Sequence, residues 1–192
     1  MIHHALARAT EGGKVHLGGN VRGVSNLQLL KEVGEGDIAV MELDSWQLQG
    51  FGDLKMSPHV AVFSSFLPDH MDYYRNDMDA YFDDKAHIFA HQQPGDVFVT
   101  TPTVFKHVEA YAKRKGYTLL QDVELTDASD FPADWQLQLP GEHNRANAAL
   151  AIEALRATSL PNELIREGVE SFMALPGRLE PLGEVRGVVI VQ

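Results

Sequence analysis

The chain has 192 residues, and its 16 lysines and arginines against 27 aspartates and glutamates give a formal net charge of −11. Its composition, 44% hydrophobic and 22% charged, is that of a folded globular protein and excludes wholesale disorder. No apolar run approaches the roughly 18 residues of a membrane span, and no secretion signal is recognisable, so we expect a cytoplasmic protein without membrane contact. The lack of cysteine excludes disulfides and thiol catalysis. The acidic balance argues against a nucleic-acid partner.

Short β-rich segments alternate along the chain with segments of helical periodicity. Strands are predicted at Lys14–Leu17, Asp37–Leu43, His59–Ser64, Asp96–Thr101 and Tyr117–Leu120, and helices at Ser25–Val33, Met78–His91, Thr103–Lys115, Asn144–Ala157 and Asn162–Met173. This alternation predicts an α/β domain, a mostly parallel sheet flanked by helices. The segment Arg178–Gln192 predicts a C-terminal β-hairpin with its turn near Arg186-Gly187.

Both ends of the chain break the α/β pattern. Met1–Thr10 has helical character with no strand before it, and Val189–Gln192 is an apolar strand with nothing after it to cover it. We therefore interpret the chain as a fragment of a longer enzyme.

Three metal-ligating side chains follow neighbouring predicted strands. Glu42 ends one strand, and Asp69 and His70 follow the next one. The carboxyl ends of parallel strands meet at one sheet edge, where ligands bind, so these groups could share a divalent cation. The alternative is that Asp69 caps a helix and His70 is a partly buried polar residue.

Lys85 lies on a predicted helix between Asp83 and Asp84. A lysine in such surroundings is usually a solvated surface charge. The functional alternative requires Lys85 to turn toward the sheet edge, where it would meet a phosphate or carry a carbamate that ligates a metal.

Other polar positions carry weaker signals. The turn Gly18-Gly19-Asn20 would let a ligand approach the backbone closely, although it also suits a simple strand-to-helix turn. Asn144 and Asn147 lie one turn apart and suit the edge of a ring such as adenine, with N-capping as the alternative. Arg178 is a candidate phosphate contact or a surface ion pair. The sequence contains no nucleotide-binding phosphate loop, dinucleotide fingerprint or serine-hydrolase elbow.

Several of these segments, in this order, resemble the central, ATP-binding domain of the Mur ligase family: Leu17–Asn20, Met41–Leu48, Asp69–Asp72, Tyr81–Lys85, Gly141–Asn147 and Leu175–Glu180. The resemblance covers nearly the whole chain and is strongest to the type that adds D-glutamate. It implies a P-loop-type fold and an enzyme that uses ATP and Mg²⁺ to join D-glutamate to a UDP-muramoyl nucleotide substrate, UDP-N-acetylmuramoyl-L-alanine, through an acyl phosphate, in peptidoglycan precursor synthesis.

The resemblance also assigns roles to individual residues. It implies that Glu42 and His70 are magnesium ligands and that Lys85 is carbamylated, all three being catalytic. The remaining implied contacts are to the nucleotide, from Asn144, Asn147 and Arg178, and to the substrate, from Asn20, Asp44 and Ser45.

The chain departs from the family pattern in three ways. Asp44 stands where the D-glutamate-adding type has serine, and Gly177 stands where it has histidine. The family's phosphate loop, on a strand central to the sheet, should lie just before Met1. We also expect the family's N-terminal UDP-binding domain and its C-terminal domain to lie outside these residues, so that residues 1–192 form a single truncated central domain.

These departures lead to two expectations and two alternatives. We expect the isolated chain to be inactive as a ligase, and the missing strand to leave a gap in the sheet that invites dimerisation. One alternative is another Mur ligase or an enzyme like folylpolyglutamate synthase. The other is a non-catalytic domain that binds a nucleotide, a metal or a partner.

Overall fold

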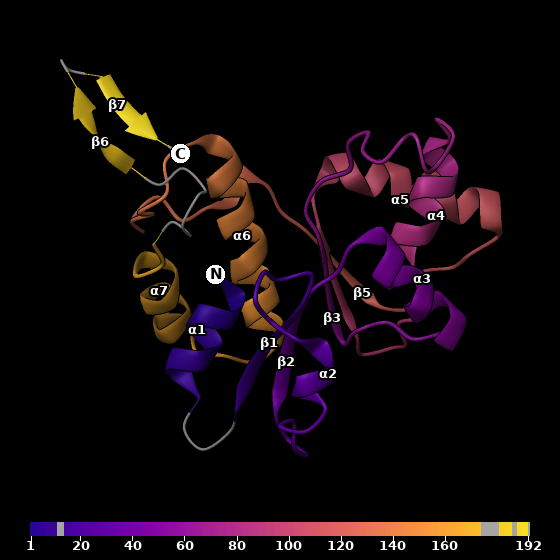
Figure 1. Cartoon of the computed structure of the whole chain (residues 1–192), viewed down its shortest axis with the longest axis horizontal. Helices are drawn as coiled ribbons and strands as arrows, with labels where there is room; N and C mark the ends of the chain where they lie inside the picture. Colours follow the sequence, from indigo (N-terminus) through magenta and orange to yellow (C-terminus); the bar gives the residue numbers. More distant parts are fainter. Residues whose placement is uncertain (11–13, 174–180, 186–187, 192) are drawn as a thin grey trace.

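The computed structural model describes residues 1–10, 14–173, 181–185 and 188–191, and within these ranges it contains two parallel sheets and one hairpin (Figure 1). The first sheet pairs β1 (Val15–Gly19) with β2 (Ile38–Glu42). The second has the order β3 (Val60–Phe63), β4 (Val97–Thr100), β5 (Asp122–Leu125). The predicted α/β class with parallel strands is therefore confirmed.

Seven α-helices lie in the described ranges. They are α1 (Ile2–Ala9), α2 (Asn26–Leu29), α3 (Ser45–Leu54), α4 (Met78–Ala86), α5 (Pro102–Lys115), α6 (Glu142–Ala157) and α7 (Asn162–Glu170), with one 3₁₀ turn at Ala128–Asp130. Helix α5 illustrates how local sequence sets these bounds. The Thr101 side chain accepts from the Val104 N–H at its start, and Gly116 takes the left-handed conformation at its end.

Helix α6 holds the two parallel sheets together. On one side, Ile152 and Leu155 pack in a core with α1, α7 and the β1–β2 sheet. On the other side, Leu150 and Ala154 pack against β3 and β4. A third core, built on Phe82, Phe89 and Phe98, joins α4 and α5 to the β3–β5 sheet. Figure 1 shows α6 running alongside both sheets.

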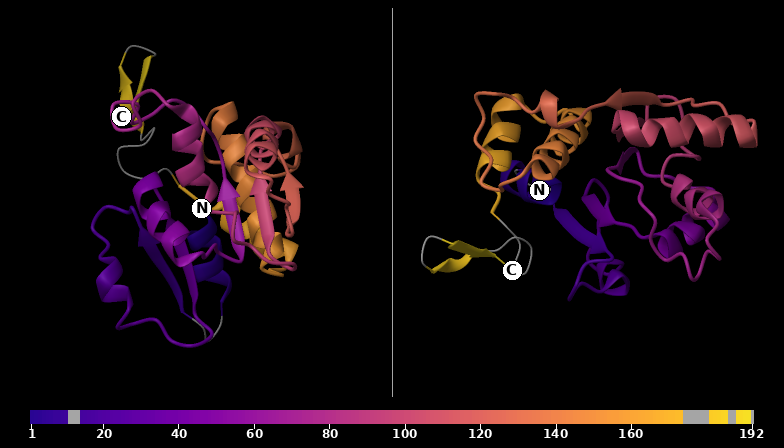
Figure 2. Two further views of the ribbon diagram at one scale, coloured as in Figure 1. Left: turned by 90° about the vertical axis from the view of Figure 1, so that its right-hand side faces the viewer. Right: turned by 90° about the horizontal axis from the view of Figure 1, so that it is seen from above.

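Strands β6 (Pro181–Val185) and β7 (Val188–Val191) form the predicted antiparallel hairpin. Both views of Figure 2 show the hairpin standing apart from the two parallel sheets. Among the described helices, none is long and apolar enough to cross a membrane.

The sheet is interrupted between β2 and β3. In the described part of the chain, β2 pairs only with β1, and β3 pairs only with β4. A cavity of about 600 Å³ lies at this break, lined by Val40 and Glu42 from the first sheet and Val62 from the second. The predicted gap in the sheet is therefore present, and two strand edges border it.

Several elements of the structure differ from the prediction, including α2, which is shorter than the predicted helix Ser25–Val33, and α7, which ends at Glu170 and not at Met173. The fifth strand is Asp122–Leu125 and not Tyr117–Leu120, since Tyr117 and Leu119 pack on the Phe82 core without joining the ladder. Helix α3 was not predicted, although Asp44 and Gln47 form a capping box at its start. The predicted helix Met78–His91 ends at Ala86 and continues as turns.

Candidate functional site

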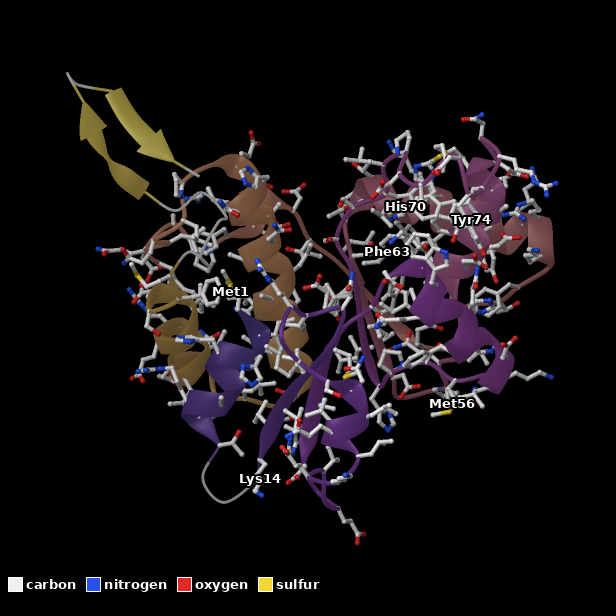
Figure 3. All side chains as sticks on the ribbon, in the orientation of Figure 1. Met1, Lys14, Met56, Phe63, His70 and Tyr74 are labelled. Carbon is white, nitrogen blue, oxygen red and sulfur yellow. The ribbon has the colours of Figure 1, made fainter. Side chains whose placement is uncertain are left out.

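The candidate site lies where β1, β2 and β3 end. Figure 3 shows Phe63, at the end of β3, close to His70 and Tyr74, whereas Met56 lies toward the opposite end of that strand. Carboxyl ends of parallel strands are the usual place for ligands in α/β proteins. The predicted site residues divide here into two groups, one at the break in the sheet and one around Lys85.

The Gly18-Gly19-Asn20 turn belongs to the group at the break. The Asn20 backbone N–H donates a 2.6 Å hydrogen bond to the carbonyl oxygen of Glu42, so the two residues lie side by side at the ends of β1 and β2. Gly19 has a φ of 90°. Both Asn20 and Glu42 are exposed and open to a ligand.

The cavity at the break gathers two predicted site residues. Glu42 and Asn147 both line it, together with Ser64 after β3 and Met1 at the start of α1. Asn144 does not line it, and its side-chain amide donates to the Pro140 carbonyl at 2.7 Å. Arg178 and the rest of Pro176-Gly177-Arg178 lie outside the described residues.

Lys85 turns toward the end of β3. Its Nζ lies 5.2 Å from the centre of the Tyr81 ring and 5.8 Å from that of Phe63. It also lines a cavity of about 110 Å³ with Ser64 and Ser65. The structure therefore favours the inward-facing interpretation of this lysine over the solvated surface charge.

Burial lowers the pKa of Lys85, and the nearby carboxylates of Asp44 and Asp69 act in the opposite direction. A lowered lysine pKa increases the fraction of neutral amine, which is the nucleophilic form. Burial likewise raises the pKa of the neighbouring Tyr81 hydroxyl, and the charge of Asp69 adds to that rise. Lys85 is thus a partly desolvated amine whose charge is influenced by two nearby acidic side chains.

Asp44 and Ser45 begin α3 beside this cluster. The Asp44 carboxylate accepts the Gln47 backbone N–H at 2.8 Å and so caps the helix. Ser45 is 1% exposed. A substrate would therefore reach Asp44 first, and contact with the Ser45 hydroxyl would require the first turn of α3 to move.

His70 follows β3 in a strained turn. Its φ is 54°, and its backbone N–H donates to Asp69 Oδ1 at 2.8 Å. Its ring Nε2 lies 3.4 Å from Asp69 Oδ2, and the Trp46 ring lies 4.5 Å from the imidazole, centre to centre. Asp77, not Asp69, caps helix α4.

A hydrogen-bond network centred on Asp84 connects the elements that carry Lys85 and His70. Asp84 Oδ2 accepts from Gln49 Nε2 at 2.7 Å and from the Tyr74 hydroxyl at 2.8 Å. Burial raises the pKa of Tyr74 to about 12, and the bond to Asp84 contributes to that rise. Asp84 therefore fixes α3 and the turn after His70 to α4, which carries Lys85.

The donors fit a magnesium ion that also binds substrate. Within the described ranges, no three His, Asp or Glu side chains are grouped to hold a metal by themselves. Glu42 and His70 do not share a cage with Asp69, because β2 and β3 lie in different sheets and are not neighbours. Mg²⁺, however, usually takes only one or two protein carboxylates and completes its shell with water and substrate phosphates.

Sequence comparison places the chain among known proteins. The family model for the Mur ligase middle domain matches residues 1–155. The chain belongs to the Mur ligase family. It is 36% identical to the UDP-N-acetylmuramoylalanine–D-glutamate ligase of Oleidesulfovibrio alaskensis, over 97% of this chain and 40% of that protein. The ligase of the same name from Ruegeria pomeroyi is 32% identical, over all of this chain and 45% of that protein.

Solved structures agree on the fold. MurF from Acinetobacter baumannii has a TM-score of 0.69 at 16% identity, covering 96% of this chain and 45% of MurF. The apo form of Lactobacillus casei FPGS has a TM-score of 0.60 at 16% identity, covering 99% of this chain and 63% of that protein. The chain thus has a Mur ligase central-domain fold and spans about two fifths of the length of its curated relatives.

Two contributors to the site were not predicted from the sequence. Trp46 contacts His70, and Asp84 holds the network together. The sequence offers one indication for each. Trp46 directly follows the predicted substrate contacts Asp44 and Ser45, and Asp84 directly precedes Lys85.

Proposed function

We propose that this chain is the central part of an ATP-dependent ligase that adds D-glutamate to UDP-N-acetylmuramoyl-L-alanine in the cytoplasm. The observation that carries the proposal is Lys85, a desolvated amine at the end of β3 facing Asp44 and Asp69. The D-glutamate ligases at 36% and 32% identity support the choice of substrate.

The reaction has two steps. A carboxylate oxygen of the muramoyl substrate attacks the γ-phosphorus of ATP, so an acyl phosphate forms and ADP leaves. The amine nitrogen of D-glutamate then attacks the acyl carbon, loses a proton, and expels inorganic phosphate as the amide forms. Negative charge on the transferring phosphoryl group is what the protein must stabilise.

Each predicted residue has a place in this scheme. Glu42 and Asn147 line the cavity at the break in the sheet, where the nucleotide would bind, with Asn144 and Arg178 as further nucleotide contacts. Asn20, with Asp44 and Ser45, would contact the muramoyl substrate. In the carbamate of Lys85, neutral Nζ is bonded to the carbon of CO₂ and its proton has gone to solvent. This change replaces a cation by an anionic oxygen ligand.

Magnesium would be held in two places. Glu42 would hold one ion together with nucleotide phosphates, and His70 with the Lys85 carbamate would hold another. The ions would supply positive charge to the phosphoryl oxygens. The protein groups around them orient the substrate and exclude water from the cluster.

We propose further that the isolated chain lacks ligase activity. The described residues offer no glycine-rich loop that would cradle the β- and γ-phosphates. The free edges of β2 and β3 favour pairing with a second copy of the chain. Sedimentation as a monodisperse monomer at high protein concentration would contradict the pairing.

A chimeric enzyme tests the proposal. This chain replaces the segment that it matches in the Oleidesulfovibrio alaskensis ligase, and product is followed by mass spectrometry with UDP-N-acetylmuramoyl-L-alanine, ATP and D-glutamate. We expect the amide product from the chimera, none from its Lys85→Arg form and none from the isolated chain. A folded chimera that hydrolyses no ATP and makes no amide would overturn the assignment.

Asp44 favours a second candidate within the same reaction class. Its carboxylate acts on the charge of Lys85, and an incoming acidic amino acid would meet like charge there. A ligase of another Mur type, which joins an amino acid without a side-chain carboxylate, fits that feature. An enzyme similar to folylpolyglutamate synthetase is the other alternative, and it rests on the likeness of the fold and not on Asp44. Supplying the chimera with other amino acids, and with a folate as the carboxylate substrate, distinguishes the two. A non-catalytic binding domain would bind nucleotide with the chimera still inactive.

A further inference from the structure

Asp69 and Trp46, which have no place in the proposed reaction, both contact His70. The Asp69 carboxylate touches it twice, through the backbone N–H at 2.8 Å and across 3.4 Å to ring Nε2. The second distance is about half an ångström longer than a hydrogen bond and lies within ion-pair range.

Trp46 restricts the ring from a different element. Trp46 comes from α3. The centre of its ring lies 4.5 Å from that of the imidazole, with an angle of 55° between the ring planes, and 5.5 Å from the centre of the Tyr73 ring. Gln49 on the same helix donates to the Tyr73 hydroxyl at 3.3 Å and to Asp84 at 2.7 Å. The indole is 41% exposed, so the contact with His70 is made at the surface of the site and not in the core.

These contacts distinguish the two ring nitrogens. Neither ring nitrogen makes a hydrogen bond among the described residues, but Nε2 lies within ion-pair distance of the Asp69 carboxylate, at 3.4 Å. A histidine that binds a metal commonly donates its other ring N–H to a carboxylate, which fixes both tautomer and orientation. The left-handed backbone of His70 adds to the constraint, since few residues hold that conformation without surrounding support.

We propose that Asp69 and Trp46 are positioning residues for His70, holding Nε2–H toward Asp69 and leaving Nδ1 as the nitrogen that meets a metal ion. The metal part rests on the proposed function. The orientation part does not, because it concerns the chain without ligands.

The test is nitrogen NMR of the full chain labelled with ¹⁵N-histidine, at a mildly alkaline pH where imidazole is neutral. His70 is assigned by the loss of its signals in His70→Gln. We expect a single Nε2–H tautomer in the wild type, and mixtures of both tautomers in Asp69→Ala and in Trp46→Ala. Trp135→Phe is the matched control, because the second tryptophan packs on Phe131 in another core. An Nδ1–H tautomer in the wild type, or an unchanged tautomer in both variants, would overturn the proposal.

Manganese serves as the metal probe in the same spectra. Added Mn²⁺ should broaden His70 Nδ1 more than Nε2, and Asp69→Ala should weaken Mn²⁺ binding about 10–100-fold. Because Asp69 also faces Lys85, Lys85→Met is the second control and should leave the tautomer of His70 unchanged. Stronger broadening of Nε2, or none at His70, overturns Nδ1 as the metal-facing nitrogen. The failure of the chimera to make product would leave the tautomer result intact, so the two proposals fail separately.

Discussion

The carbonyl of Glu42 occupies the space in which a Cβ atom on Gly19 would lie. Gly19 also has a φ of 90°, which L side chains rarely adopt. This close approach brings Asn20 and Glu42 together at the carboxyl edge of the first sheet. The glycine is therefore required by geometry at the site itself.

Substitution of this glycine should be costly. We expect Gly19→Ala to lower the free energy of unfolding by at least about 1–3 kcal/mol, from backbone strain and from displacement of β2. Gly50→Ala is the control, since it lies within α3 with open space around its Cα and should gain roughly 0.5–1 kcal/mol. Urea titrations of both variants check this. Equal stability of the two would show that β1 and β2 do not approach in this way.

Helix α6 should make the two sheets unfold together. Leu150 is 2% exposed and packs on the side of β3 and β4, so Leu150→Ala should cost about 2–5 kcal/mol. The two tryptophans report on different regions, Trp46 beside the β3–β5 sheet and Trp135 in the core under β1 and β2.

Single-tryptophan forms, Trp46→Phe and Trp135→Phe, separate these signals. The same urea midpoint should appear in both, and Leu150→Ala should shift both equally. Two separate midpoints would mean that the break in the sheet divides the chain into independent units.

Asp37 should make stability sensitive to acid. Its carboxylate accepts from the backbone N–H groups of Gly34 and Lys14 and from His16, and these bonds lower its pKa to about 2. A carboxyl with a depressed pKa stabilises the fold above its unfolded pKa of 3.8, and that contribution is lost as pH falls toward about 2. Asp37→Asn should therefore lower the melting temperature at neutral pH, and the difference from wild type should shrink below about pH 4.

The exposed Asp53 provides the matched control, because Asp53→Asn removes a carboxyl from a helix surface. It should leave the pH profile of the melting temperature unchanged. A constant difference between wild type and Asp37→Asn from neutral pH to about pH 2 would contradict the role given to Asp37.

The sequence predicted most strands because their apolar runs are bounded by turn residues, as in Val60–Phe63 and Val97–Thr100. It misplaced β5, since Asp122–Leu125 alternates polar and apolar residues at the edge of its sheet, whereas the more apolar run Tyr117–Leu120 before it lies outside the ladder. Helix α3 was not predicted because its glycines weaken the helical pattern of the sequence.

The sequence predicted which residues belong to the site but not how they are arranged relative to one another. Periodicity could not show that Lys85 turns toward the end of β3, near Asp44 and Asp69. Its sequence neighbours Asp83 and Asp84 have the pattern of a solvated helix face. The separation of Glu42 from the His70 cluster was also hidden, since it depends on the break between β2 and β3. Such long-range pairing is a property of the tertiary fold.

The most direct test of the account is the carbamylation of Lys85. The full chain is placed in ¹³C-labelled bicarbonate at mildly alkaline pH, and carbamate carbon is observed by NMR in wild type, Lys85→Arg and Lys115→Arg, the last removing a lysine that is ion-paired with Asp83. We predict a carbamate signal that persists in Lys115→Arg and disappears in Lys85→Arg, because burial keeps the Lys85 amine more neutral than a solvated one. A wild-type chain without this signal, or a signal that survives Lys85→Arg, would contradict the functional role given to Lys85.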